Sequence, residues 1–256
     1  MNRATCNGTP GDCGKTGFTI IELLVVLALF ALTAAIGAAA LRYAIEEGRR
    51  SACLNNLRQM VTAAYLYAAN HDGRFPPGMA YEQDGNRVTL HAWDFSTSRD
   101  WDTGTQQVKP GLLWQGAGDL RVQQCPSFCG ESNWDGDPYT GYNYNVSYVG
   151  HGMGETITTP IRTSEIRNPS NCVLFGDGEW AGGANKFMRS PRTAPGDAAF
   201  SGRYAGTQGF RHRGYSNVAF ADGRAESRRD RHEGPYGNLP DHIGFLSDDN
   251  SLYDLY

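Results

Sequence analysis

The chain lacks an excess of basic charge, and this absence bears on the partners that it can bind. Charged residues make up 20% of its 256 residues, and the formal net charge is −4. Binding to a phosphate backbone needs a basic face on the protein. We therefore expect no nucleic acid among the main partners.

A convincing catalytic grouping is also missing from the sequence. Ser127 and Ser147 do not stand in the strand–turn–helix setting of a nucleophile elbow. An acid–base or metal cluster could be drawn from His212, Asp177, Asp222, His151 and Glu179, but Asp-Gly turns are common and this evidence is weak. We favour a structural role for His212 and Asp222, in which they hold a loop against a sheet. We therefore expect no enzyme activity and no obligatory cofactor.

The cysteines are few, and their spacing does not indicate a single disulfide framework. Two of the six cysteines precede a long apolar segment, and four follow it: Cys53, Cys125, Cys129 and Cys172. If the later part is exported, these four could form two disulfides in three possible pairings. Cys125 and Cys129 are the favoured pair, because so short a gap can close a tight loop. A zinc site is the rival interpretation, but no second closely spaced Cys or His pair completes four ligands.

Proline is absent from residues 20–41, which carry a single charge, Glu22. This run of about 22 residues makes roughly 33 Å of helix, enough to cross the core of a bilayer. Beyond it, apolar residues recur three or four positions apart: Leu54, Leu57, Val61, Tyr65 and Ala68. This spacing predicts an amphipathic continuation, and Asp72-Gly73 marks its end. We expect one helix over residues 18–70.

The residues around Glu22 carry a specific motif. Residues 15–26 read KTGFTIIELLVV and resemble the N-terminal motif of type IV prepilins and type II secretion pseudopilins. The resemblance implies that prepilin peptidase cuts after Gly17 and methylates the new N-terminus at Phe18. It also implies that Glu22 pairs with the N-terminal amine of a neighbouring subunit. Two opposite charges attract strongly in a medium of low dielectric constant, so the pairing is physically reasonable.

A second resemblance lies near the C-terminus. His212, nine intervening residues and then Asp222-Gly223 are similar to a pattern of the large planctomycete-type pseudopilins. Major pseudopilins of the wider family bind calcium in a C-terminal loop. Here residues 247–250 offer hard oxygen ligands, so Asp248 and Asp249 are weak calcium candidates, with a solvated acidic tail as the alternative.

The resemblance implies a function. The chain is expected to be a structural subunit of a type II secretion or type IV pilus-like filament. Its expected partners are prepilin peptidase, other pseudopilin subunits and an inner-membrane assembly platform. It would cross the inner membrane once and place its C-terminal domain in the periplasm. One alternative is a minor pilin or adhesin that recognises polysaccharide or secreted cargo. Another is an ordinary signal peptide with a cleavage site near residues 38–40.

The fold class follows from the change of pattern after the helix. Short β-branched and aromatic runs alternate with turn residues. Two of them, residues 171–178 and 217–223, each end in Asp-Gly, a signal for a hairpin turn, and we expect both in one antiparallel sheet. We predict an α+β fold in which the long N-terminal helix packs on a small antiparallel sheet with extended loops. The predicted parts are a leader (1–17), a transmembrane segment (18–41), an amphipathic half-helix (42–72) and a β-rich globular domain (73–256).

Overall fold

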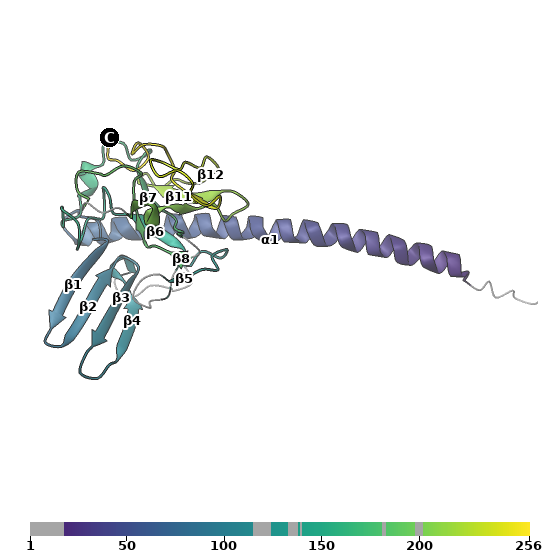
Figure 1. Cartoon of the computed structure of the whole chain (residues 1–256), viewed down its shortest axis with the longest axis horizontal. Helices are drawn as coiled ribbons and strands as arrows, with labels where there is room; N and C mark the ends of the chain where they lie inside the picture. The colour runs from purple at the N-terminus through teal and green to yellow at the C-terminus, as the bar shows by residue number, and fades with distance from the viewer. Residues whose placement is uncertain (1–17, 115–123, 133–137, 139, 181–182, 198–201) are drawn as a thin grey trace, which may run out of the picture. The chain divides into compact units, whose positions relative to one another are not determined.

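The computed structural model describes residues 18–114, 124–132, 138, 140–180, 183–197 and 202–256 (Figure 1). The predicted leader, residues 1–17, therefore lies outside the described residues, and Gly17 with it. The chain divides into two compact units, Met1–Ala44 and Ile45–Tyr256. The boundary falls within the long helix, so the second half of the helix groups with the globular part. The sequence-based division had placed this half apart, as residues 42–72.

One helix, α1, covers Ile20–Asn70, which confirms the prediction of a single long helix. It begins two residues later than expected and runs without a break through Gly37 and Gly48. After its end, Asp72 and Gly73 adopt positive φ angles of 55° and 73°. The amide of Gly73 then donates to the carbonyl of Ala68 at 2.9 Å. This left-handed turn satisfies a terminal carbonyl and stops the helix.

In the first unit, the apolar side chains of α1 are exposed. Leu29 is 57% exposed and Phe30 is 73% exposed. By length and composition the helix can cross a membrane, in agreement with the predicted transmembrane segment.

The second unit is organised around a five-stranded sheet in the order β12-β11-β7-β6-β9. Its strands are β6 (Tyr142–Asn145), β7 (Val173–Asp177), β9 (Phe187–Met188), β11 (Ser216–Phe220) and β12 (Ala225–Arg228). All neighbours are antiparallel except β6 and β9. The two predicted apolar runs are β7 and β11. Both lie in this sheet, and they pair directly with each other.

The sheet and the second half of α1 share one core. Leu57, Met60 and Val61 of α1 form a buried cluster with Phe175 of β7 and Ala219 of β11. Burial of such side chains contributes about 1.5–3 kcal/mol each. The packing of helix on sheet confirms the predicted α+β fold.

A separate antiparallel meander follows the helix. Its strands, in spatial order, are β1 (Met79–Asp84), β2 (Arg87–Ala92), β3 (Phe95–Asp100) and β4 (Gln106–Pro110). Two short two-stranded sheets are also present: β5 (Glu131–Ser132) pairs with β8 (Gly183–Ala184), and β10 (Gln208–Gly209) pairs with β13 (Ile243–Gly244). Single 3₁₀ turns occur at Leu112–Trp114, Thr163–Glu165 and Arg203–Gly206.

The two Asp-Gly pairs have different structures. Asp222 and Gly223 form the turn between β11 and β12, with Gly223 at a φ of 88°, so this hairpin signal is confirmed. Asp177 is instead the fully buried last residue of β7, and the next strand in sequence does not pair with β7. The hairpin expected at Asp177-Gly178 is wrong, because the Asp177 carboxylate is bound inside the unit.

Candidate functional site

The N-terminal turn of α1 holds the first candidate residues. Phe18 is 83% exposed. The Glu22 carboxylate accepts hydrogen bonds from the Thr19 amide at 2.8 Å and from the Thr19 hydroxyl at 2.9 Å. In return, the Glu22 amide donates to the Thr19 hydroxyl oxygen at 3.2 Å. This reciprocal pattern is a capping box, which satisfies amides at the start of a helix.

The capping box gives Glu22 a local role that the sequence interpretation did not include. The signal was present, because Thr followed three residues later by Glu before an apolar run is the pattern of such a box. A carboxylate at this end also interacts favourably with the helix dipole. A role of Glu22 in assembly therefore has to be separated from its role in starting the helix.

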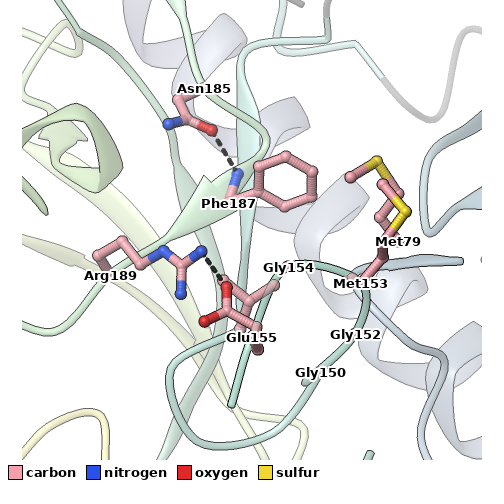
Figure 2. Close-up of a pocket in the computed structure, with 11 residues that line it drawn as sticks. Met79, Gly150, Gly152, Met153, Gly154, Glu155, Asn185, Phe187 and Arg189 are labelled. Carbon is pink, nitrogen blue, oxygen red and sulfur yellow. Dashed lines mark hydrogen bonds and ion pairs between the residues drawn. The ribbon is translucent and has the colours of Figure 1, made fainter. Parts of the chain in front are cut away.

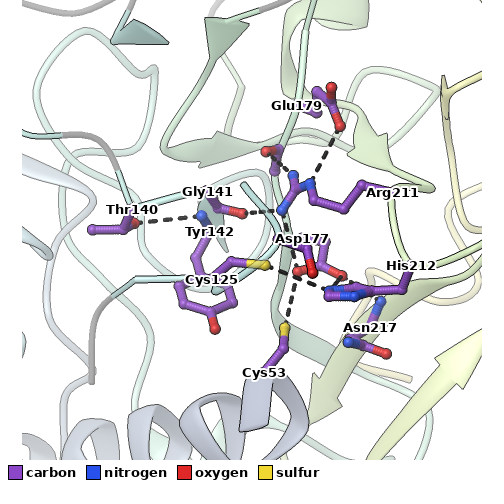
Figure 3. Close-up of polar contacts among 12 residues, drawn as sticks. Cys53, Cys125, Thr140, Gly141, Tyr142, Asp177, Glu179, Arg211, His212 and Asn217 are labelled. Carbon is purple, nitrogen blue, oxygen red and sulfur yellow. Dashed lines mark hydrogen bonds and ion pairs between the residues drawn. The ribbon is translucent and has the colours of Figure 1, made fainter. Parts of the chain in front are cut away.

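The second candidate is a buried cluster inside residues 45–256 (Figure 3). It joins Cys53 on α1, Cys125 in a loop, Asp177 at the end of β7 and His212 before β11. One donor atom from each side chain lies within 4.8 Å of the others. All four residues are fully buried. Cys53 and Asp177 stand 124 positions apart in the sequence.

Three distances define the cluster. The Cys53 thiol donates to Asp177 Oδ1 at 3.2 Å. His212 Nε2 lies 3.5 Å from the Cys125 sulfur and 3.4 Å from Asp177 Oδ2. Each side chain therefore has its reactive atom directed at the same small volume, as Figure 3 shows.

Polar neighbours hold the cluster in place. Glu46 Oε1 lies 3.0 Å from His212 Nδ1. The backbone amide of Asn217 donates to Asp177 Oδ2 at 2.7 Å. Arg211 donates to the carbonyl of Gly141 at 2.9 Å and lies 3.4 Å from Asp177 Oδ1. These contacts fix the orientation of the imidazole and of the carboxylate.

Burial and close partners shift the pKa values of the cluster. Burial raises the pKa of Asp177 to about 7, although Arg211 and His212 act in the opposite direction. The pKa of Cys53 is raised, chiefly by burial. The pKa of Cys125 is lowered, first by its hydrogen bond to Cys53 and then by His212. Burial alone would lower the pKa of His212, but its contacts with Cys125 and Asp177 outweigh burial and raise it.

The disulfide predicted between Cys125 and Cys129 is wrong for this structure. Both are free cysteines, with Cys125 buried and Cys129 exposed. Cys125 instead faces Cys53 and His212, which lie far from it in sequence. Sequence spacing suggested a local partner, whereas tertiary packing supplied distant ones. No short motif could have identified this set.

His212 and Asp222 do not share a site. His212 contacts α1 through Glu46 and β7 through Asp177, and so it does hold its loop against the sheet. Asp222 lies in the β11–β12 turn, where it accepts the amide of Arg224 at 2.9 Å. The nine-residue spacing therefore links a buried imidazole to a surface turn.

The two weak calcium candidates lie at the surface and have other partners. Asp248 Oδ2 lies 3.1 Å from His232 Nδ1. Asp249 accepts the amide of Ser251 at 3.0 Å and its hydroxyl at 2.6 Å. The calcium site stays a prediction.

A pocket of about 440 Å³ opens elsewhere in the second unit (Figure 2). Its apolar lining includes Met79, Met153 and Phe187. Arg189 also lines it and is held by Glu155 and, at 3.1 Å, by Asp197. The pocket therefore combines apolar walls with a guanidinium that two carboxylates already bind.

Comparison with known proteins bears on the N-terminal segment. The family described as the prokaryotic N-terminal methylation motif matches residues 13–38. Neither the curated proteins nor the solved structures yielded a match. The match does not reach His212 or Asp222, so the planctomycete-type subgroup stays a prediction. The chain carries the prokaryotic N-terminal methylation motif, and this match supports its placement in the type IV pilin and pseudopilin family.

Proposed function

We propose that the chain is a filament subunit of the type II secretion or type IV pilus kind, and that it has no enzyme activity. In this proposal prepilin peptidase cuts between Gly17 and Phe18, the Phe18 amine is methylated, and α1 then joins other subunits. The motif match over residues 13–38 is the observation that carries the proposal.

The exposed apolar half of α1 supports the same function. An apolar helix with all its faces exposed is stable either in lipid or against other apolar helices. A pilin-like subunit uses both environments in turn, first in the inner membrane and then in the filament. We further propose that the C-terminal unit lies in the periplasm and that assembly uses an inner-membrane platform.

Glu22 can act in filament assembly or in capping the helix, and each role predicts that a different variant fails to assemble. In the assembly role its charge pairs with the Phe18 amine of a neighbour, because a lone carboxylate in an apolar stretch is costly. In the capping role its oxygen accepts the Thr19 amide. Glutamine keeps the acceptor of a capping box but removes the charge.

The experiment compares Glu22→Gln with Thr19→Ala in the full chain. Glu22→Gln should be cleaved at Gly17 yet be lost from sheared filaments, because the countercharge is gone. Thr19→Ala should still assemble, since it weakens the cap by about 1 kcal/mol but keeps the charge. Assembly is measured by immunoblotting of the sheared fraction, and mass analysis of the N-terminus reports cleavage and methylation.

Two results would contradict the proposal. If Glu22→Gln assembled like the unmodified chain, the charge pairing would be wrong, and loss of assembly in Thr19→Ala alone would assign the defect to capping. If the membrane-extracted chain began elsewhere than at Phe18, or lacked the added methyl group, the processing route would be wrong.

A further inference from the structure

The buried cluster has the donor types of a tetrahedral metal site. Two thiols, one imidazole and one carboxylate converge from Cys53, Cys125, His212 and Asp177. Thiolate and imidazole together are the usual ligands of structural zinc, with carboxylate oxygen as an accepted fourth. Calcium and magnesium prefer oxygen donors alone, and Cu(I) prefers an all-sulfur set. The donor set therefore favours Zn²⁺.

The distances between donors agree with this choice. Zinc–ligand bonds of about 2.0–2.3 Å in tetrahedral geometry separate the donor atoms by roughly 3.3–3.8 Å. The separations here are 3.2 Å from Cys53 Sγ to Asp177 Oδ1, 3.5 Å from Cys125 Sγ to His212 Nε2 and 3.4 Å from His212 Nε2 to Asp177 Oδ2. With one donor atom taken from each residue, all four lie within 4.8 Å of one another. An ion at the centre needs only small movements of these side chains.

The surroundings also have the form of a metal site. A zinc-bound histidine commonly places its second ring nitrogen against a carboxylate, which fixes the tautomer and directs the other nitrogen at the metal. Glu46 does this to His212 Nδ1 at 3.0 Å and leaves Nε2 facing the thiols. Arg211 adds a positive charge beside Asp177, which offsets the charge of two thiolates and a carboxylate around a divalent ion.

A hydrogen-bonded cluster without a metal explains the arrangement less well. Asn217 and Arg211 already stabilise the Asp177 carboxylate, but sulfur is a weak donor and a weak acceptor, so the two buried thiols are poorly satisfied without a metal. A disulfide between Cys53 and Cys125 would remove the thiol proton that Cys53 donates to Asp177 Oδ1 and would change the sulfur that lies beside His212 Nε2. A divalent cation satisfies all four donors at once.

We propose that Cys53, Cys125, Asp177 and His212 bind one Zn²⁺ as a closed structural site. Such an ion would connect α1 to β7 and to two loops, across sequence separations of 124 and 87 residues. Because a preformed site does not exist in the unfolded chain, binding of the metal stabilises the fold. The inference does not depend on the proposed function, since it concerns only the stability of residues 45–256.

The first experiment measures zinc in the full chain, extracted from membranes in detergent and purified without a histidine tag. Mass spectrometry of the metal content should give about one zinc per chain. Cys53→Ser and His212→Ala should lose most of it. Cys172→Ser is the matched control, because Cys172 is buried but its sulfur lies 3.8 Å from the Tyr253 carbonyl and outside the cluster. This variant should keep its zinc.

A second measurement on the unmodified chain guards against variants that fail to fold. Removal of the metal with a chelator should lower the thermal midpoint and expose Cys53 and Cys125 to alkylation. Added Co²⁺ should then produce a thiolate charge-transfer band and the intense visible bands of a tetrahedral site. A cooperatively folded chain that contains no zinc and takes up no Co²⁺ would overturn the proposal. A Cys53–Cys125 disulfide in non-reduced peptides of the native chain would overturn it as well.

Discussion

At the scale of single residues, burial distinguishes the cysteines and sequence spacing does not. Cys125 and Cys129 are near neighbours in sequence, yet one is buried beside Cys53 and the other is exposed. Cys172 is buried in the core next to the end of the chain, with its sulfur near Tyr253. The chemical behaviour of each thiol therefore depends on its tertiary surroundings.

Thiol labelling tests this distinction. Burial raises the pKa of Cys172 to about 12, so at about pH 8 only about one ten-thousandth of this thiol is ionised. Iodoacetamide should label Cys129 rapidly in the native chain and Cys172 only after denaturation. Peptide mass spectrometry at successive times gives both rates, with the denatured chain as the control. Equal rates in the native chain would show that Cys172 is not buried as described.

At the scale of secondary-structure elements, the observed length and end of α1 agree with those predicted from the sequence pattern. The apolar spacing predicted its length, and the Asp72-Gly73 signal predicted its end to within two residues. Gly48 lies inside the helix and Gly73 lies just past it, and an added Cβ would meet no atom within 4 Å at either position. Substitution at these glycines therefore reports on backbone conformation alone.

Alanine at the two glycines should have opposite effects. Gly48→Ala should raise the stability of the chain by up to about 1 kcal/mol, because alanine is the better helix former. Gly73→Ala should lower it by about 1–2 kcal/mol, because Gly73 has a φ of 73° and a Cβ is strained in the left-handed region. Urea unfolding monitored by tryptophan fluorescence gives both values. Changes of the same sign would contradict the assigned end of the helix.

At the scale of the whole molecule, α1 belongs to both units, and its two halves have different surroundings. Its first half exposes apolar side chains on every face, whereas its second half buries Leu57, Met60 and Val61 in the core. Leu29 and Leu66 are exposed to a similar degree, 57% and 60%, but belong to different units. They form a matched pair for a test of membrane insertion.

Arginine substitutions at Leu29 and Leu66 should differ in their effect on membrane insertion. Leu29→Arg places a charge inside the apolar segment and should weaken insertion by about 2.5–3.5 kcal/mol. Leu66→Arg adds the same charge to an exposed site in the second unit and should leave insertion unchanged. The measurement is the fraction of chain that stays in membranes after an alkaline wash. Full retention of Leu29→Arg would argue against residues 20–41 as the anchor.

Features that depend on neighbouring residues could be predicted from the amino-acid sequence. These are the motif around Glu22, the single long helix, the apolar strands β7 and β11, and the turn at Asp222-Gly223. Periodicity and turn chemistry act over a few residues, so they can be read in order along the chain. The capping box of Thr19 and Glu22 belongs to this class as well.

The composition of the buried cluster, by contrast, follows from tertiary packing. Cys53 looked like one more position on a helix, Asp177 like half of a turn, and Cys125 like the partner of Cys129. Packing of α1 on the sheet brings these residues to His212, which stands 159 positions after Cys53 in the sequence. Contacts at such range depend on how whole elements pack, and no local pattern encodes that packing.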